Sequence, residues 1–169
     1  MKNSELIKLI DHLLWADNKI WDCVLSNKSL SEDENIKNTL FHSHMTQDAF
    51  YHIWINRDFD IPRNESFEEI TAVKKYADQT LKEIKEYSAN INEVDLNKEI
   101  NVPWSKYFEE STGKIPEETT LGDTILQVIM HTTYHRGQIN KRIRELDHEP
   151  PLVDYIVWLW AGQPKAQSD

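Results

Sequence analysis

Hydrophobic residues recur at steps of three and four residues through four long stretches of the chain, the spacing that gathers them on one face of an α-helix. The first stretch shows this most clearly, with Leu6, Ile10, Leu13 and Ile20 in register. Together the stretches cover residues 4–25, 34–57, 66–89 and 120–147. The pattern therefore predicts four amphipathic helices of about 20 residues each.

Turn and capping residues separate these stretches. Residues 29–33 supply them between the first two helices. Ser66 and Glu69 have the spacing of a capping box at the start of the third helix. Asp123 follows Thr120 by three residues where the fourth helix is expected to begin.

Residues 90–118 differ from the helical stretches. Ile100, Val102 and Trp104 occupy alternate positions, as side chains on one face of a strand do. We expect a short hairpin or an ordered loop in this segment.

The end of the chain predicts one more helix, over residues 153–160, with Trp158 and Trp160 packed back onto the rest of the protein. The fold class that follows is all-α. It is a four-helix bundle with a short C-terminal helix and a long loop or small hairpin between helices 3 and 4. The 169 residues are enough for one core, so we expect a single domain over residues 1–169.

Charge and cysteine content narrow the possible functions. The net charge is −10, which disfavours binding to nucleic acids and to anionic membrane surfaces. Cys23 is the only cysteine, so neither an intramolecular disulfide nor a thiol-cluster metal site can form. The chain shows neither a signal-peptide pattern nor an apolar run of membrane-spanning length, so we expect a cytoplasmic protein.

Two of the seven histidines, His131 and His135, stand four residues apart in the fourth predicted helix. At this spacing both rings leave the same face one turn apart, so they can share a cation. Their face neighbours Val128 and Ile139 indicate that the pair points inward. The spacing alone fits a metal-binding pair and a hydrogen-bonded core pair about equally well.

A third ligand would come from the second predicted helix. His42 shares a face with small and apolar residues such as Ala49 and Phe50, which leave room for an ion. His44 shares its face with Asp48, which indicates a side nearer to solvent. His42 is therefore the preferred ligand and His44 the alternative. The other histidines are expected to be ordinary surface or boundary residues: His12, His52 and His148.

Three neutral imidazoles and water suit one divalent transition metal ion such as zinc, nickel or iron(II). The coordination positions left open are typical of a reactive site. A zincin protease would need glutamate where Thr132 stands. A di-iron bundle would need two Glu-x-x-His units, and only Glu145 with His148 has that spacing.

The stretch HTTYHRGQINKRIRELDHEPPLVDYIVWLW, residues 131–160, closely resembles the C-terminal signature of the DinB-like family. These are helical-bundle proteins related to DNA-damage-inducible DinB and to the YfiT-type metal-dependent hydrolases. The segment TLFHSHMTQDAF is similar to the second-helix pattern of the family. In that pattern a metal histidine precedes a polar group by five residues and an aromatic by eight, which selects His42 with Gln47 and Phe50.

The resemblance implies a three-histidine metal site formed by His42, His131 and His135. It also implies a range of activities, because relatives include bacillithiol-using S-transferases and a mycothiol-dependent isomerase. The leading hypothesis is a metal-dependent thiol S-transferase or hydrolase acting on a small substrate, with a low-molecular-weight thiol as a second cofactor. The alternative is a non-catalytic, metal-binding, stress-associated protein. A homodimer is also implied, with Trp54 and Trp104 as candidate surface aromatics.

Other residues of the signature have structural interpretations. We expect Gly137 to allow close packing against a neighbouring helix, because glycine in mid-helix otherwise costs about 1 kcal/mol. Tyr134 is expected in the core. Arg136 would either orient ligands or pair with Asp154 or another acid.

Overall fold

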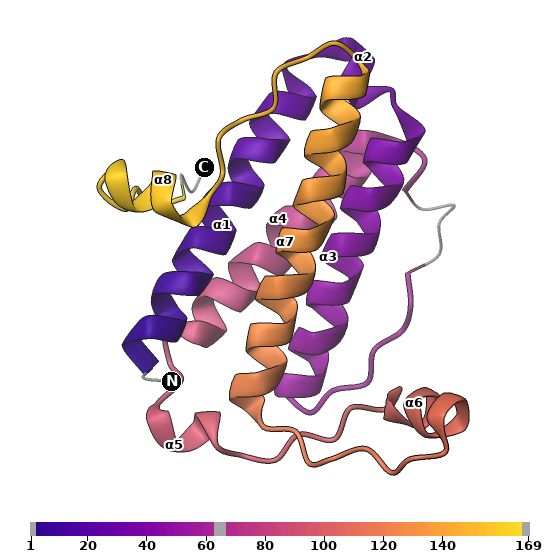
Figure 1. Ribbon diagram of the computed structural model, residues 1–169, viewed down its shortest axis with the longest axis vertical. Helices are drawn as coiled ribbons and strands as arrows, with labels where there is room; N and C mark the ends of the chain where they lie inside the picture. Colours follow the sequence, from indigo (N-terminus) through magenta and orange to yellow (C-terminus); the bar gives the residue numbers. More distant parts are fainter. Residues whose placement is uncertain (1–2, 63–66, 167–169) are drawn as a thin grey trace.

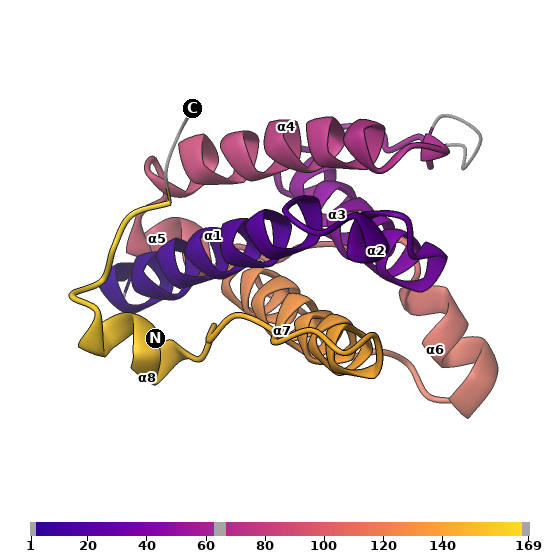
Figure 2. The same ribbon diagram turned by 90° about the horizontal axis from the view of Figure 1, so that it is seen from above.

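Four long helices make up the body of the protein in the computed structural model, which describes residues 3–62 and 67–166 (Figure 1). They are α1 (Asn3–Leu25), α3 (Glu34–Trp54), α4 (Ile70–Ser88) and α7 (Leu121–Glu145). Both α1 and α3 contact α4 on one side and α7 on the other, as the view from above shows (Figure 2). The predicted all-α four-helix bundle is confirmed.

Side-chain caps set the starts of two of these helices. Asp33 accepts a hydrogen bond from the backbone N–H of Ile36 at the start of α3. Thr120 and Asp123 form a reciprocal capping box at the start of α7, as their spacing predicts. Helix α4 begins after Glu69, without a side-chain cap hydrogen bond, and Ser66 lies outside the described residues.

Left-handed backbone conformations follow the ends of α3 and α7. Asn56 has φ 53° and Asp147 has φ 60°, a region that helical residues do not occupy. Helix α3 therefore ends at Trp54, earlier than the periodicity of the sequence predicts. Between α1 and α3 the polar residues form a short helix, α2 (Lys28–Ser31), where a turn is expected.

The connection between α4 and α7 contains two short helices, α5 (Glu93–Leu96) and α6 (Ser105–Thr112). Helix α5 starts at a capping box formed by Asn92 and Asp95. Residues 98–100 meet residues 119–121 at an isolated bridge between Glu99 and Thr120. The described residues contain no hairpin. Backbone pairing in this segment is confined to the bridge between Glu99 and Thr120, and the chain enters α6 a few residues after Glu99.

The C-terminal helix is α8 (Tyr155–Trp160). Trp158 is buried, as predicted, and donates from Nε1 to the carbonyl oxygen of Pro164. Trp160 is 78% exposed, so the prediction that both tryptophans pack inward is wrong for this residue. None of the helices in the described ranges combines the length and the apolar character of a transmembrane span.

The buried hydrophobic residues of the described chain form two clusters, one toward each end of the bundle. In α3 the clusters include Leu40 on one side and Phe50 on the other, and in α7 they include Ile129 and Ile139. Buried polar residues occupy the level between them: His44, Gln47, Thr132, His135 and Arg136. The candidate site lies at this polar level.

Candidate metal centre

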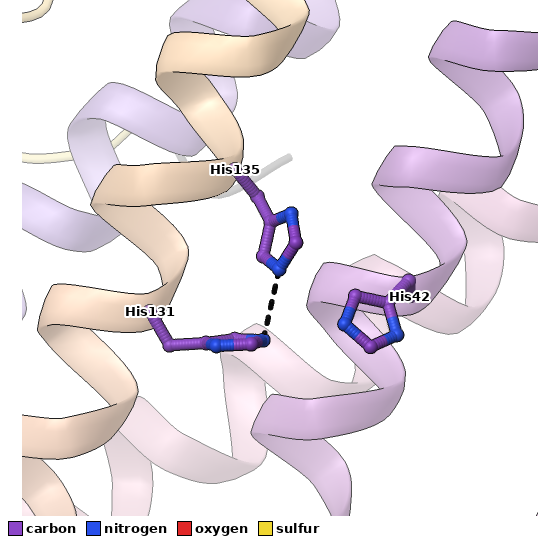
Figure 3. Close-up of side chains that lie close together, drawn as sticks. All are labelled: His42, His131 and His135. Atoms are coloured by element: carbon purple, nitrogen blue, oxygen red, sulfur yellow. Dashed lines mark hydrogen bonds between the residues drawn. The ribbon is translucent and has the colours of Figure 1, made fainter.

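His42 of α3 and the pair His131 and His135 of α7 bring their rings together between the two helices (Figure 3). Each ring offers one nitrogen atom, and these three atoms all lie within 4.8 Å of one another. The centroid of the His42 ring is 4.7 Å from that of His135 and 5.4 Å from that of His131. The three histidines are therefore close enough to hold one metal ion.

The two histidines of α7 already face each other. Their Nε2 atoms are 3.0 Å apart. Nitrogen ligands at about 2.0–2.1 Å from a zinc ion come to within a few ångströms of each other, so a small outward movement would admit an ion between these atoms. The inward orientation expected from the faces of α7 is thus observed for His135, which is buried, and His131, which is half-buried.

Burial keeps the ring of His131 neutral over a wide pH range. Burial, and to a smaller extent the neighbouring His135 and His42, lower the pKa of His131 to about 4. The pKa of His42 is also lowered, by partial burial and then by His135. A neutral imidazole has the free electron pair that a metal ion requires, so the cluster suits a cation better than protons.

One ring of the cluster is oriented by a neighbouring side chain. His135 donates from Nδ1 to Oε1 of Gln138 over 2.8 Å, which leaves the electron pair of Nε2 directed at the cluster. Metal-binding histidines commonly have such a partner on the second nitrogen. Tyr134 lies beside the same ring, with centroids 5.3 Å apart, but it is 64% exposed, so its predicted core position is wrong.

His44, the alternative ligand, has a different role. It is 1% exposed, so the prediction that it faces solvent is wrong. Its Nε2 accepts a hydrogen bond of 3.0 Å from Nε1 of Trp21, and its Nδ1 donates to Oε1 of Gln47 over 2.9 Å. Both ring nitrogens are therefore engaged away from the cluster. The structure brings His42, and not His44, to the pair on α7.

A buried polar network adjoins the cluster and joins three helices. Gln47 donates from Nε2 to Asp17 of α1 and to Thr132 of α7, both over 3.0 Å. Arg136 donates from Nη1 to the other carboxylate oxygen of Asp17 over 2.9 Å. Arg136 therefore pairs with an acid, and that acid is Asp17 rather than Asp154. Because Thr132 and Arg136 flank the ligand positions on α7, this network fixes the helix that carries them.

The remaining histidines are partly misjudged by sequence. His12 is buried, and its Nε2 lies 2.9 Å from the carbonyl oxygen of Val153, so it is not a surface residue. His52 is half-buried beside Asp48, and His148 lies 2.7 Å from the hydroxyl of Ser29. None of these three belongs to the histidine cluster.

Gly137 does not serve close packing. A Cβ atom at this position would meet no atom within 4 Å outside its local helix backbone. Trp54 is also not a surface aromatic, because it is buried and donates from Nε1 to the hydroxyl of Thr124. Trp104 is partly exposed, as expected.

A cavity of about 1160 Å³ opens beside the cluster, and His131 forms part of its wall. Its other walls are the facing sides of α3 and α7 and two segments that lie over them, around Phe59 and around Trp104. The sequence pattern did not reveal this cavity, because residues from the connection between α4 and α7 form one of its walls. A molecule bound there would have access to His131.

The fold and this site define an all-α bundle protein whose facing helices present three histidines able to hold one metal ion. The model of the DinB family matches residues 1–166, so the chain belongs to the DinB family. A comparison with curated proteins gives no match.

Proposed function

We propose that this protein binds one divalent transition metal ion through His42, His131 and His135. We further propose that the metal-loaded site catalyses the transfer of a low-molecular-weight thiol to an electrophile or the hydrolysis of a small substrate. The observation that carries the proposal is the convergence of three ring nitrogens to within 4.8 Å of one another, beside a cavity that His131 lines. Membership of the DinB family agrees with it.

The residues fit such an ion chemically. All three donors are imidazoles, which suit zinc, nickel and iron(II). Burial depresses the pKa values of His42 and His131, so these rings compete weakly for protons. A metal ion held there would act as a Lewis acid and lower the pKa of a thiol or of water beside it.

The protein itself would orient a metal ligand and exclude water from bound substrate. Gln138 holds the ring of His135 through Nδ1, and the cavity beside His131 offers a space from which bound substrate displaces water. The carboxylate of Asp123 at the cavity wall accepts the hydrogen bonds of the Thr120 cap. We therefore do not assign Asp123 the role of a general base.

The first test is metal content. Protein purified without chelators and then offered zinc, nickel or iron(II) should retain about one ion per chain by elemental analysis. His131→Ala and His135→Ala should each lose it, because a site with two imidazoles binds far more weakly. His148→Ala is the matched control, since it removes an imidazole outside the cluster and should retain the ion. Absence of bound metal in the wild-type protein would refute the proposal.

The second test separates an enzyme from a metal-binding protein without turnover. Metal-loaded protein is offered a low-molecular-weight thiol with a chlorodinitrobenzene-type electrophile, and separately a nitrophenyl ester. Turnover that disappears in His131→Ala and persists in His148→Ala supports the enzyme. Stoichiometric metal with background rates on both substrates supports the non-catalytic alternative.

A further inference from the structure

The cavity beside His131 is lined by aromatic side chains from both of its covering segments and from α3. Phe50 of α3 meets Trp104 edge to face, with ring centroids 5.0 Å apart. Phe59 and Phe108 also line the cavity. Trp104 and Phe108 remain exposed although they border a cavity. Exposed aromatic surface gathered around a concave site is typical of a site that binds an apolar ligand.

The charges at the cavity balance to a small negative value. Arg57 is its cationic side chain, and its neighbour in sequence, Asp58, lines the cavity with it. Asp123 adds a second carboxylate, which is already bonded to Thr120. No cluster of cations among the described lining residues would hold a phosphate or another multiply charged anion. The lining therefore favours an uncharged molecule.

The dimensions of the cavity favour a ligand larger than a simple thiol or ester. A volume of about 1160 Å³ lies just above the range of about 300–1,000 Å³ for sites of small organic molecules. Along α3 the wall extends from Met45 to Ile53, and this length of helix spans about 12 Å at a rise of about 1.5 Å per residue. His131 lies at the wall that α7 contributes. A long molecule could thus lie between α3 and α7 with one end at the histidine cluster.

We propose that this cavity binds an elongated, uncharged organic molecule with at least one aromatic ring, and that Phe50, Trp104 and Phe108 select for the ring. That this molecule is the substrate rests on the function proposed above. Its binding does not, because the aromatic walls belong to residues other than the three histidines. Ala49, a small residue on the α3 wall, leaves the space that the ring would occupy.

The test uses N-phenyl-naphthylamine, a neutral aromatic dye that fluoresces in apolar sites, with the full-length protein. The dye should bind with one Kd whether or not metal is present. Its sulfonated analogue, anilinonaphthalene sulfonate, should bind more weakly because the site lacks a surplus of cations. Ala49→Trp places an indole in the space left beside Ala49 and should raise the Kd of the neutral dye about tenfold or more. Trp104→Ala removes one ring contact and should raise it by up to about tenfold.

Trp160→Ala is the matched control, because it removes an exposed tryptophan from α8, which does not line the cavity. Circular dichroism checks that each variant is folded. If Ala49→Trp fails to fold, the test rests on Trp104→Ala, at the start of α6. Dye binding that is absent in the wild type, or unchanged in folded Ala49→Trp and Trp104→Ala, overturns the inference. Metal content, measured on the same samples, is independent of dye binding. Failure of the proposed metal site can therefore be distinguished from failure of the proposed ligand site.

Discussion

Arg136 and Asp17 form an ion pair of 2.9 Å that joins α7 to α1, and both side chains are only 5% exposed. Arg136 directly follows His135 in the chain. Gln47 binds the second carboxylate oxygen of Asp17, so neither oxygen is left without a partner. A fully paired buried ion pair of this kind holds two helices in one register, because each partner is costly to bury alone.

We predict that Arg136→Met lowers the free energy of unfolding by about 3–5 kcal/mol, because it leaves the carboxylate of Asp17 buried without its cation. Urea denaturation at neutral pH measures the loss. Arg144→Met is the control, since Arg144 is exposed on the same helix and should change stability by no more than about 0.5 kcal/mol. Equal effects of the two substitutions would contradict a structural role for the ion pair.

The hydrogen bonds of His44 predict its tautomer. Nε2 accepts from Trp21 and Nδ1 donates to Gln47, so the proton must be on Nδ1. Burial also lowers the pKa of His44, which keeps the ring neutral. Long-range nitrogen–proton spectra should therefore show the His44 ring neutral and in the Nδ1–H form, whether metal is present or absent.

Trp21→Phe removes the donor to Nε2 and should destabilise the protein by about 1–3 kcal/mol, the cost of an unpaired buried acceptor. The His44 signals should shift in this variant. Trp54→Phe replaces another buried indole, one bonded to Thr124, and should leave those signals unchanged. A His44 ring that responds to added zinc as a ligand does would disprove this assignment.

The long helices were predictable because each buries one continuous face, and that face repeats visibly over many residues. The choice of His42 followed from the same principle, since its face also carries Ala49 and Phe50. Short helices such as α5 and α6 escaped prediction. They are too short for periodicity, and local caps such as that of Asn92 decide where they form.

The buried polar level could not be predicted from the sequence. Asp17 and Arg136 are 119 positions apart, so the spacing of residues along the chain does not pair them. His44 was misplaced for the same reason, because its partner Trp21 lies on a different helix. A polar residue is buried only when a partner is available, and partners from other helices become visible only in the folded protein.

We predict that removing the metal lowers thermal stability. An ion present at about 100 times its Kd stabilises the folded state by about 2.7 kcal/mol if it does not bind the unfolded chain. For a chain of this length the corresponding fall in Tm on adding a chelator is about 5–10 °C. Calorimetry with and without chelator measures it. His148→Ala should show the same fall and His131→Ala none, whereas a wild-type Tm indifferent to chelator would count against the metal centre.

Asp48 lies on the side of α3 that faces α4, and its burial should make the free energy of unfolding depend on pH. Burial raises its pKa above the ordinary value of 3.8, although Tyr76 donates to it over 2.7 Å and His52 lies nearby. The unfolded carboxyl therefore loses its proton at a lower pH than the folded one. The folded state is penalised progressively as pH rises from 3.8 to the raised value, and the penalty is constant above it.

Asp48→Asn keeps an acceptor for Tyr76 and removes the charge. Relative to the wild type, this variant should gain stability as pH rises from about 4 to neutrality, measured by urea denaturation at several pH values. Asp22→Asn, at an exposed position on α1, is the control for the general effect of charge. A gain that is independent of pH, or one that grows on acidification, would show that Asp48 is not the group responsible.

Two glycines of α7 should respond differently to substitution by alanine. At Gly137 an added Cβ would meet no atom within 4 Å outside the local helix backbone, so alanine gains helix propensity at no steric cost. Gly137→Ala should therefore raise the free energy of unfolding by about 1 kcal/mol. At Gly122 the Cβ would lie 3.2 Å from the backbone oxygen of Leu96, and backbone cannot easily move aside. Gly122→Ala should thus gain less or lose stability. Because Gly137 is two residues from His135, the metal content of both variants should also be measured, to show whether the gain in stability leaves the histidine cluster undisturbed. A Gly137→Ala variant less stable than the wild type would mean that the backbone at this position needs the freedom of glycine.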